Sequence, residues 1–356
     1  MNASGDSDRD VRRGSNFGIL RLLFAALVVV SHSPELIDGN RSRELLTRLF
    51  GTLSFGELAV DGFFLISGYL ILKSYRNAAS VWDYLAKRVL RIYPGFIAAS
   101  LVAILLVAPI SGGHLASVSP FAAMIDMVTL TPPKVPCSFE GIPGAELNGA
   151  MWTVRYEFRC YLLVILLGGL ASRANRRGYA MLLACLTALY LLRPGMQEIQ
   201  RGGPLFLLMA DMARFAFVFF IGGAFYVWRD RIAYHRLGAL MAGGALIPLL
   251  FVAPLAEAGL ATFGGYLIFW YAFACPTSSL SRMTDHTDPS YGLYLYAWPI
   301  QSLIVASVPG IAPWVVTAAT LPLGLMLGVL SWRLIEKPAL RHKDIFLTLT
   351  GKTATP

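Results

Sequence analysis

The feature that most constrains the fold of this chain is a series of apolar runs, each about as long as a bilayer is thick. The hydrocarbon core of a membrane is about 30 Å across, and a helix needs about 20 residues to cross it. Only 14% of the residues are charged and 56% are hydrophobic, a balance that is foreign to soluble domains. The runs occupy residues 17–36, 55–73, 92–110, 150–170, 179–192, 205–227, 237–253, 260–280, 290–308 and 313–334. The sequence therefore predicts an all-α, polytopic membrane protein with about ten transmembrane helices.

The charges between these runs predict how the chain is threaded through the membrane. The net charge is +9, and the Lys and Arg residues gather in alternate loops and in both terminal segments. The positive-inside rule then predicts that both termini are cytosolic and that the chain lies in the inner (cytoplasmic) membrane. We expect a cytosolic tail over 1–16, a transmembrane domain over 17–336 and a second cytosolic tail over 337–356. Membrane lipids are expected partners and nucleic acid is not, because the basic residues follow the topology.

The cysteines and the first apolar run exclude two other interpretations. The chain has four cysteines without metal-ligand spacing, so we expect no metal site and no disulfide framework. The first run follows an arginine-rich segment, as a signal peptide would, but no small-x-small cleavage site follows it. We therefore expect a retained first helix.

Arg21 and His32 are the first candidates for chemistry, because ionisable groups inside a membrane are costly and mark functional positions. They lie eleven residues apart in the first run. This spacing returns a helix to within about 20° of the same face and separates the two residues by about 16 Å along it. Neutral imidazole is a natural general base near pH 7. The structural alternative is that Arg21 snorkels to the cytosolic surface and His32 only packs near the outer helix end.

Asp61 and a basic cluster are the next candidates. Asp61 lies among apolar residues and glycines, which favours a close helix contact with a paired charge. It could orient a histidine or an arginine, or form a structural ion pair. Arg88 and Arg91 lie three residues apart beside Lys87, on one helical face. Two guanidinium groups at a cytosolic entrance suit the phosphates of a nucleotide-bearing acyl donor, although ordinary positive-inside charge also explains them.

The start of the fourth run combines aromatic and charged residues. Trp152 and Tyr156 are one helical turn apart, and Glu157 follows directly. An aromatic pair with a carboxylate at a membrane face could grip a sugar ring. Arg155 and Arg159 are also one turn apart. An aromatic belt explains Trp and Tyr at such a place, but it does not explain an acid between two arginines.

The ninth run and the longest loop complete the set. The run carries Tyr291, Tyr294 and Tyr296, whose hydroxyls could line a polar cleft or serve packing alone. The loop over 111–149 is rich in Gly and Pro, yet its stretch 121–130 is apolar. We expect part of this loop, on the outer side, to dip into the protein as a lid or re-entrant segment.

Taken in order, these motifs resemble those of the acyltransferase-3 superfamily of membrane O-acyltransferases, and the resemblance covers nearly the whole chain. The motifs are Arg-x10-His (Arg21, His32), Asp-x-Phe-Phe-x-x-Ser-Gly-Tyr-Leu (Asp61 to Leu70), Arg-x-x-Arg before Ile-Tyr-Pro (Arg88, Arg91), Trp-Thr-x-x-x-Glu (Trp152 to Glu157), Ser-Tyr-Gly-x-Tyr-Leu-x-x-x-Pro-Ile (Ser290 to Ile300) and Arg-x-x-Glu-x-Pro (Arg333 to Pro338). Any one of them is a weak signal, but six in order are specific.

The resemblance implies a transfer reaction across the bundle. An acyl group, most often acetyl, would pass from cytosolic acyl-CoA to a hydroxyl of an exopolysaccharide, an O-antigen or a lipid-linked repeat unit. Arg88, Arg91 and Arg21 would hold the phosphates of coenzyme A. His32, oriented by Asp61 or Glu157, would deprotonate the acceptor hydroxyl for direct attack or accept the acyl group first. The expected acceptor-binding residues are Trp152, Tyr156 and Tyr294.

One departure and two rival functions accompany this prediction. Many relatives read Tyr-Leu-x-His-x-Pro on the ninth helix, where this chain has Ala297, so a second intramembrane histidine is missing. A transporter or flippase of a lipid-linked saccharide would share the helices, charges and polar cleft. Such a protein has no need of a phosphate-binding face or a deep histidine. Acylation of a small glycoside on the inner side is the other alternative.

Overall fold

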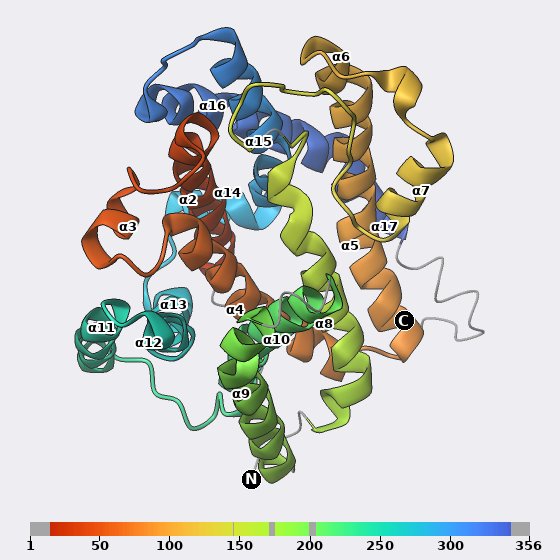
Figure 1. The fold of residues 1–356 in the computed structure, drawn as a ribbon. Coiled ribbons are helices and arrows are strands. Elements are labelled where there is room, and N and C mark those ends of the chain that lie inside the picture. Colours follow the sequence, from red (N-terminus) through yellow and green to blue (C-terminus); the bar gives the residue numbers. More distant parts are fainter. Residues whose placement is uncertain (1–14, 145, 171–174, 199–203, 343–356) are drawn as a thin grey trace.

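The computed structural model describes residues 15–144, 146–170, 175–198 and 204–342. Within these ranges the regular structure is entirely helical (Figure 1). The outer parts of the two predicted tails, at 1–14 and 343–356, lie outside the described residues.

The bundle is built from long helices joined by short ones and by loops. In chain order the α-helices are α2 (Phe17–Asp38), α3 (Leu45–Phe50), α4 (Phe55–Arg76), α5 (Val81–Val102), α6 (Ala108–Ile110), α7 (Pro120–Val128), α8 (Val154–Leu167), α9 (Arg176–Glu198), α10 (Pro204–Val227), α11 (Arg236–Leu250), α12 (Ala253–Gly259), α13 (Gly265–Ala274), α14 (Ser279–His286), α15 (Ser290–Ser307), α16 (Pro313–Ser331) and α17 (Lys337–Arg341). The π-helical turns η1 (Ala103–Val107), η6 (Leu260–Gly264) and η7 (Trp332–Glu336) join consecutive α-helices, and the 3-10 turn η3 (Gly149–Thr153) leads into α8.

Five helices in the described part of the chain are long and apolar enough to cross a membrane. They are Phe17–Asp38, Phe55–Arg76, Val81–Ile110, Leu205–Val227 and Pro313–Arg341. This confirms an all-helical, multi-pass membrane protein. The other five predicted runs form helices that are shorter or less apolar, so the total of ten spans and the cytosolic termini stay predictions.

The helix that contains the third predicted run, 92–110, is α5, and it begins eleven residues earlier, at Val81. The side chain of Ser80 caps α5 by accepting a hydrogen bond from the Asp83 backbone N–H at 3.1 Å, a standard way to start a helix. The first turns of the helix carry charged residues, so they lie outside the apolar run. The helix therefore extends past the apolar run into a charged, cap-stabilised segment.

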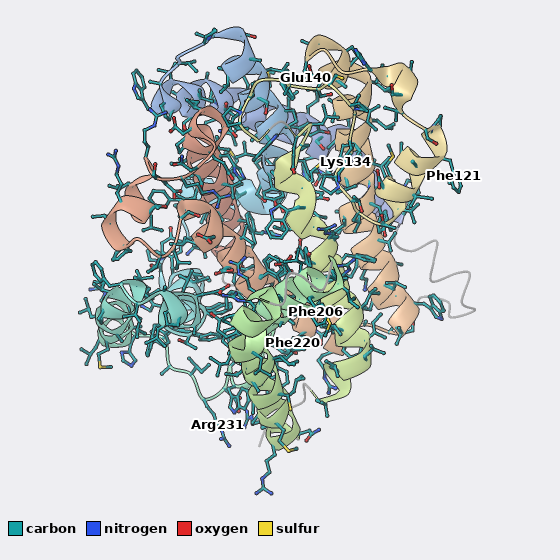
Figure 2. All side chains as sticks on the ribbon, viewed as in Figure 1. Phe121, Lys134, Glu140, Phe206, Phe220 and Arg231 are labelled. Atoms are coloured by element: carbon teal, nitrogen blue, oxygen red, sulfur yellow. The ribbon has the colours of Figure 1, made fainter. Side chains whose placement is uncertain are left out.

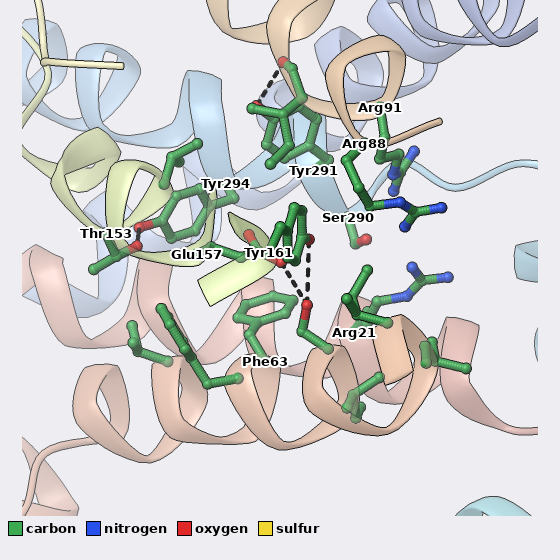
Figure 3. Close-up of a pocket in the computed structure, with 18 residues that line it drawn as sticks. Arg21, Phe63, Arg88, Arg91, Thr153, Glu157, Tyr161, Ser290, Tyr291 and Tyr294 are labelled. Carbon is green, nitrogen blue, oxygen red and sulfur yellow. Dashed lines mark hydrogen bonds between the residues drawn. The ribbon is translucent and has the colours of Figure 1, made fainter. Parts of the chain in front are cut away.

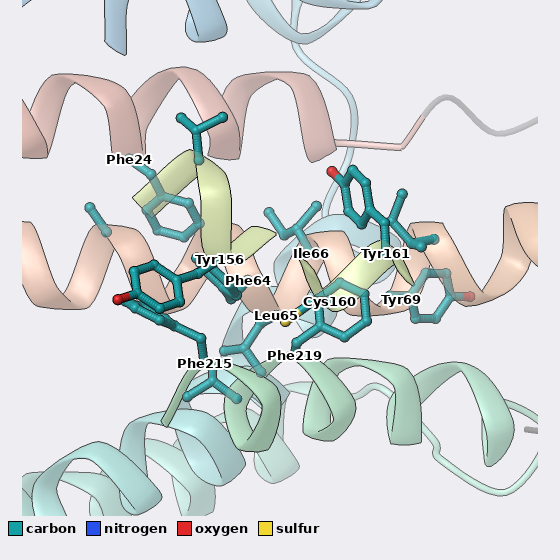
Figure 4. Packing of buried hydrophobic residues seen from close by; sticks show 14 of the residues in the cluster. Phe24, Phe64, Leu65, Ile66, Tyr69, Tyr156, Cys160, Tyr161, Phe215 and Phe219 are labelled. Atoms are coloured by element: carbon teal, nitrogen blue, oxygen red, sulfur yellow. The ribbon is translucent and has the colours of Figure 1, made fainter. Parts of the chain in front are cut away.

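Glycines bring the two helices at the centre of the bundle into close contact. A Cβ at Gly68 of α4 would lie 1.8 Å from the Phe219 carbonyl oxygen of α10, and a Cβ at Gly222 would lie 2.1 Å from the Leu65 oxygen. Only glycine allows this backbone approach, which is typical of helix pairs in membranes. The buried cluster around it joins side chains of α2, α4, α8 and α10 (Figure 4). This contact fixes the frame on which the candidate site is built.

The loop over 111–149 packs back against the protein only at the end of its apolar stretch. The Tyr93 hydroxyl, in the middle of the Val81–Ile110 rod, donates a hydrogen bond to the Val128 carbonyl oxygen at the end of α7, at 2.8 Å. Leu130, two residues on, is 1% exposed. The outward side of α7 stays uncovered, and Phe121 lies at the rim of the molecule (Figure 2). The end of this segment therefore packs along α5, and α7 itself lies on the outside of the bundle instead of forming a lid over it.

Candidate active site

Two cavities lie one after the other inside the bundle. The larger one, the arginine cavity, has a volume of about 130 Å³ and is lined by α2, α4, α5, η3, α8 and α15 (Figure 3). The smaller one, the His32 cavity, has a volume of about 40 Å³ and is lined by α2, α4, η3, α10, α15 and Arg41. Val60 and Tyr294 line both cavities. These two side chains therefore form the wall between them.

The three arginines predicted to hold phosphates lie together. Arg21, Arg88 and Arg91 all line the arginine cavity. Figure 3 shows them at one side of it, with Tyr294 at the opposite side and Glu157 and Tyr161 between. Their charges are not equally available.

Arg91 is neutralised by two carboxylates. It donates to Asp288 at 2.6 Å and to Glu336 at 3.3 Å. Arg21 reaches the same Asp288 carboxylate at 3.3 Å. Burial acts to raise the pKa of Asp288, but the charges of Arg21 and Arg91 outweigh it and hold that pKa below its ordinary value. Arg91 thus fastens α5 to the segment before α15 and to η7.

Arg88 is the available cation of this cavity. Among the described residues it forms no ion pair with a carboxylate, and its contacts are Ser74 Oγ at 3.5 Å and the face of Tyr161 at 6.0 Å. Its Nε is buried without a hydrogen-bond partner. Because an unpaired buried donor is costly, this arrangement favours an anionic ligand at Arg88.

Glu157 lies in the same cavity, away from His32. It accepts hydrogen bonds from Ser67 Oγ at 2.8 Å and from the Tyr161 hydroxyl at 2.5 Å. Tyr161 in turn carries Arg88 over its ring. Glu157 is therefore placed beside the donor arginines, not beside the imidazole that it was predicted to orient.

His32 has a different carboxylate partner. Its Nδ1 lies 2.7 Å from Glu35 Oε2, one turn further along α2. Because a carboxylate can only accept, Nδ1 carries the hydrogen, and in the neutral imidazole Nε2 then holds the lone pair. Arg41 Nε and Nη2 bind the same Glu35 oxygen at 3.1 and 3.0 Å, and Arg41 Nη1 donates to Ser54 Oγ at 3.0 Å. The imidazole is thus held in the tautomer that a general base requires.

Asp61 belongs to a buried charge network instead. It is fully buried and binds Arg214 Nη2 of α10 at 3.0 Å. Arg214 also binds Glu257, which accepts from Arg193 Nη1 at 2.7 Å. Arg214 lines the His32 cavity whereas Asp61 lines neither cavity. Asp61 therefore acts on the site only through the arginine that it positions.

The predicted acceptor-binding residues are divided by the structure. Trp152 lines the His32 cavity. Tyr294 stands in the wall, where its hydroxyl lies 2.6 Å from Thr153 Oγ1. Tyr156 lines neither cavity, and its hydroxyl donates to Asp211 of α10 at 2.8 Å. Of the three, Trp152 and Tyr294 can meet a substrate in the cavities.

The position of the missing histidine is now visible. Ala297 is 3% exposed and packs with Ala25 and Val29 of α2. Val29 lies one turn before His32, so a larger polar side chain at 297 would have to enter the α2–α15 contact. In this chain the contact is apolar, and His32 takes Glu35, not a second imidazole, as its hydrogen-bond partner.

Glu35, Asp288 and Glu336 were not among the predicted site residues. Glu35 had a detectable signal, because a carboxylate three residues after a histidine lies on the same helical face. Asp288 and Glu336 are separated from Arg91 by 197 and 245 residues, and no local pattern reveals such pairs. The described residues contain no cluster of His, Cys, Asp and Glu that could hold a metal ion.

Comparison with known proteins places this geometry in a family. Residues 15–333 match the acyltransferase-3 family model, which is described as an acyltransferase domain. The chain belongs to this family. It is 27% identical over 351 residues to the O-acetyl transferase of Shigella phage Sf6, an alignment that covers 95% of this chain and 100% of the phage protein. It is 25% identical over 365 residues to Nodulation protein 10 of Rhizobium leguminosarum bv. viciae, covering 92% and 93% of the two chains. No solved structure matches. The family and the first of these relatives establish the chain as an O-acyltransferase, so the transporter alternative is set aside.

Proposed function

We propose that this O-acyltransferase moves an acyl group, in the first place acetyl, from acyl-CoA in the arginine cavity to a saccharide hydroxyl in the His32 cavity. The observation that carries the proposal is the pair of cavities with one common wall. One holds an available arginine, and the other holds an imidazole in the general-base tautomer. The membrane in question is the inner membrane, with the arginine cavity facing the cytosol.

The donor is expected to bind by its phosphates. Arg88 supplies the guanidinium fork, and Arg21 supplies a second one, since its Nε is also buried without a hydrogen-bond partner. Arginine forks match phosphate oxygens in geometry and charge. Arg91 keeps the helices around this pocket together and contributes less to the ligand, because its charge is already balanced.

The chemical step follows from the position of the lone pair on His32. Nε2 takes the proton of the acceptor hydroxyl while the hydroxyl oxygen attacks the thioester carbonyl. The C–S bond then breaks, and the coenzyme A thiolate leaves and takes the proton from His32. Glu35 stabilises the imidazolium between these two events, and Arg41 keeps Glu35 in place. The products are an O-acyl ester and free coenzyme A.

The acceptor is expected to enter from the other side of the wall. Trp152 offers an aromatic face in the His32 cavity, and aromatic faces bind the apolar side of sugar rings. We propose an exopolysaccharide, an O-antigen or a lipid-linked repeat unit as the acceptor. A small glycoside on the inner side is the alternative, and it would have to reach His32 past Tyr294.

The test is label transfer in membranes that contain the chain. Radiolabelled acetyl-CoA is supplied with a crude glycolipid and polysaccharide fraction, and base-labile label on saccharide is counted. We expect label with the wild type and none above background with His32→Ala at equal protein level. His114→Ala is the matched control, since His114 is an exposed histidine of the outer loop. Equal label from wild type and His32→Ala would contradict the proposed mechanism.

A further inference from the structure

Two arginines of α8, which flank Glu157 in the sequence, line neither cavity. Arg155 and Arg159 lie one turn apart and flank the Tyr156 ring, with their guanidinium carbons 5.0 and 5.3 Å from its centroid. Glu157 points away from them into the arginine cavity. The two arginines therefore share one aromatic support on the other side of the helix.

These arginines lack a carboxylate partner. Neither forms an ion pair with any described acidic residue, and Arg155 Nε and Arg159 Nη1 are buried without a hydrogen-bond acceptor. Asp211, which lies at the edge of the same Tyr156 ring, accepts the hydrogen bond of the Tyr156 hydroxyl. Two half-buried guanidinium groups thus lie over one ring, and each keeps a buried nitrogen without a hydrogen-bond partner. Unused charged donors are expensive in a membrane protein and indicate a ligand.

The depth and exposure of the pair indicate where a ligand would come from. Tyr156 packs on Phe215, whose ring stacks on Phe64 near the middle of the membrane-spanning helix α4. Leu162 and Leu166 lie on the same stripe of α8 as Arg155 and Arg159 and are 41% and 77% exposed. Arg155 and Arg159 are themselves partly exposed, so a ligand can reach them from this side of α8. Trp152, one turn before Tyr156, connects the stripe to the His32 cavity.

We infer that Arg155 and Arg159 form a subsite for an anionic group of the acceptor, held while its hydroxyl reaches His32. The inference rests on the proposed function and adds the charge of the substrate. The ligand is an oxyanion, because a guanidinium pair presents planar forks that match carboxylate and phosphate. It belongs either to an acidic sugar or to the phosphate that links a saccharide to its lipid carrier.

The test compares three radiolabelled probes with the purified full-length protein in nanodiscs. The first is an oligosaccharide that contains hexuronic acid, and the second is the same oligosaccharide with its carboxylates reduced to alcohols. The third is a neutral oligosaccharide linked to polyprenyl phosphate. Equilibrium dialysis gives the Kd of each probe without any reaction, and label transfer from acetyl-CoA is measured separately.

We expect the wild type to bind at least one anionic probe about tenfold or more tightly than the neutral one, as the loss of one charged hydrogen-bonded pair implies. The double variant Arg155→Gln/Arg159→Gln should lose this preference. Arg155→Lys/Arg159→Lys keeps cations over Tyr156 and removes only the planar guanidinium groups. It should bind the anionic probe several-fold more weakly than the wild type, and it serves as the test if the glutamine variant does not fold. Arg231→Gln, at an exposed loop position (Figure 2), should change nothing.

The outcomes separate the two ideas. A preference for the hexuronate probe assigns the subsite to a sugar carboxylate, and a preference for the polyprenyl phosphate probe assigns it to the linker. Equal Kd values for all three probes, or a preference that survives both double variants, would overturn the inference whatever the reaction is. Selective binding without label transfer would leave the subsite in place and contradict the proposed function instead.

Discussion

Replacing Glu35 by glutamine tests the arrangement at His32 most sharply. The substitution keeps the size and shape of the side chain, so the packing of α2 is preserved. It removes the charge that accepts from His32 Nδ1 at 2.7 Å. Arg41 Nε and Nη2 donate to the same oxygen, so the amide oxygen of the glutamine takes its place and still accepts from Nδ1. The tautomer is kept, and what is lost is the negative charge that stabilises the imidazolium.

The magnitude follows from the loss of this charge. A hydrogen bond to a charged partner contributes about 1.5–3 kcal/mol against about 1 kcal/mol for a neutral one, so its loss alone costs a factor of about ten. Complete loss of a positioned general base costs about 10²–10⁴ in rate. We therefore expect the kcat of Glu35→Gln to fall by about tenfold, well short of that limit. Glu35→Asp keeps the charge and should recover part of the rate.

The assay is steady-state transfer of labelled acetyl groups with the acyl-CoA concentration varied. The KM for acyl-CoA should stay within about twofold of the wild type, because the donor arginines lie in the other cavity. Glu140→Gln, at an exposed position in the loop over 111–149 (Figure 2), is the control for loss of a carboxylate. A kcat for Glu35→Gln equal to that of the wild type would refute the reasoning. So would a large rise in KM without a change in kcat.

Four further predictions concern the arginine cavity, its wall and the ion pairs beside it. Arg88→Gln should raise the KM for acetyl-CoA about tenfold or more. It should leave the KM for acetyl-N-acetylcysteamine, which lacks phosphates, unchanged. Arg91→Gln should instead lower the free energy of unfolding by about 3–5 kcal/mol, measured by denaturation of the solubilised protein. Tyr294→Ala should raise the rate with butyryl-CoA relative to acetyl-CoA in competition assays, because it removes half of the wall; an unchanged ratio would argue against a wall at this position. The lowered pKa of Asp288 adds stability above its unfolded pKa of about 4, and this stability is lost as the pH falls further. The Tm of the wild type should therefore fall more steeply with pH below about pH 4 than the Tm of Asp288→Asn. An equal pH dependence of the two Tm values would contradict the Asp288 ion pairs.

The sequence predicts the features that depend on local spacing. Apolar runs predict long helices because the membrane sets their length, and the first run matches α2 closely. Arg88 and Arg91 were predicted to share a face, and both line one cavity. The expectation of an intramembrane partner for Asp61 is also met, but by Arg214, which lies 153 residues away. Which charges pair is decided by the packing of α4 on α10, and periodicity does not contain that information.

The positions of the candidate catalytic groups depend on the same distant contacts. Glu157 was expected near His32, yet the rotation of α8 directs it to Ser67 and Tyr161. Tyr156 follows Trp152 by one turn, but it is drawn away from the cavities by Asp211. The helix start at η3 is a 3-10 turn, so the angular spacing of an ideal α-helix does not apply across it. A helical wheel therefore identifies the residue types of this site but not which cavity each one faces.

The central claim is that the acyl group passes between two cavities that face opposite sides of the membrane, with His32 completing the transfer. The most direct measurement uses proteoliposomes of uniform orientation, with labelled acetyl-CoA on the side of the arginine cavity and a saccharide acceptor only on the other side. The account predicts base-labile label on the enclosed saccharide that grows with time and is absent with His32→Ala. With Arg88→Gln, the same label should need a higher concentration of acetyl-CoA. Label that forms only when donor and acceptor share one compartment would contradict the account.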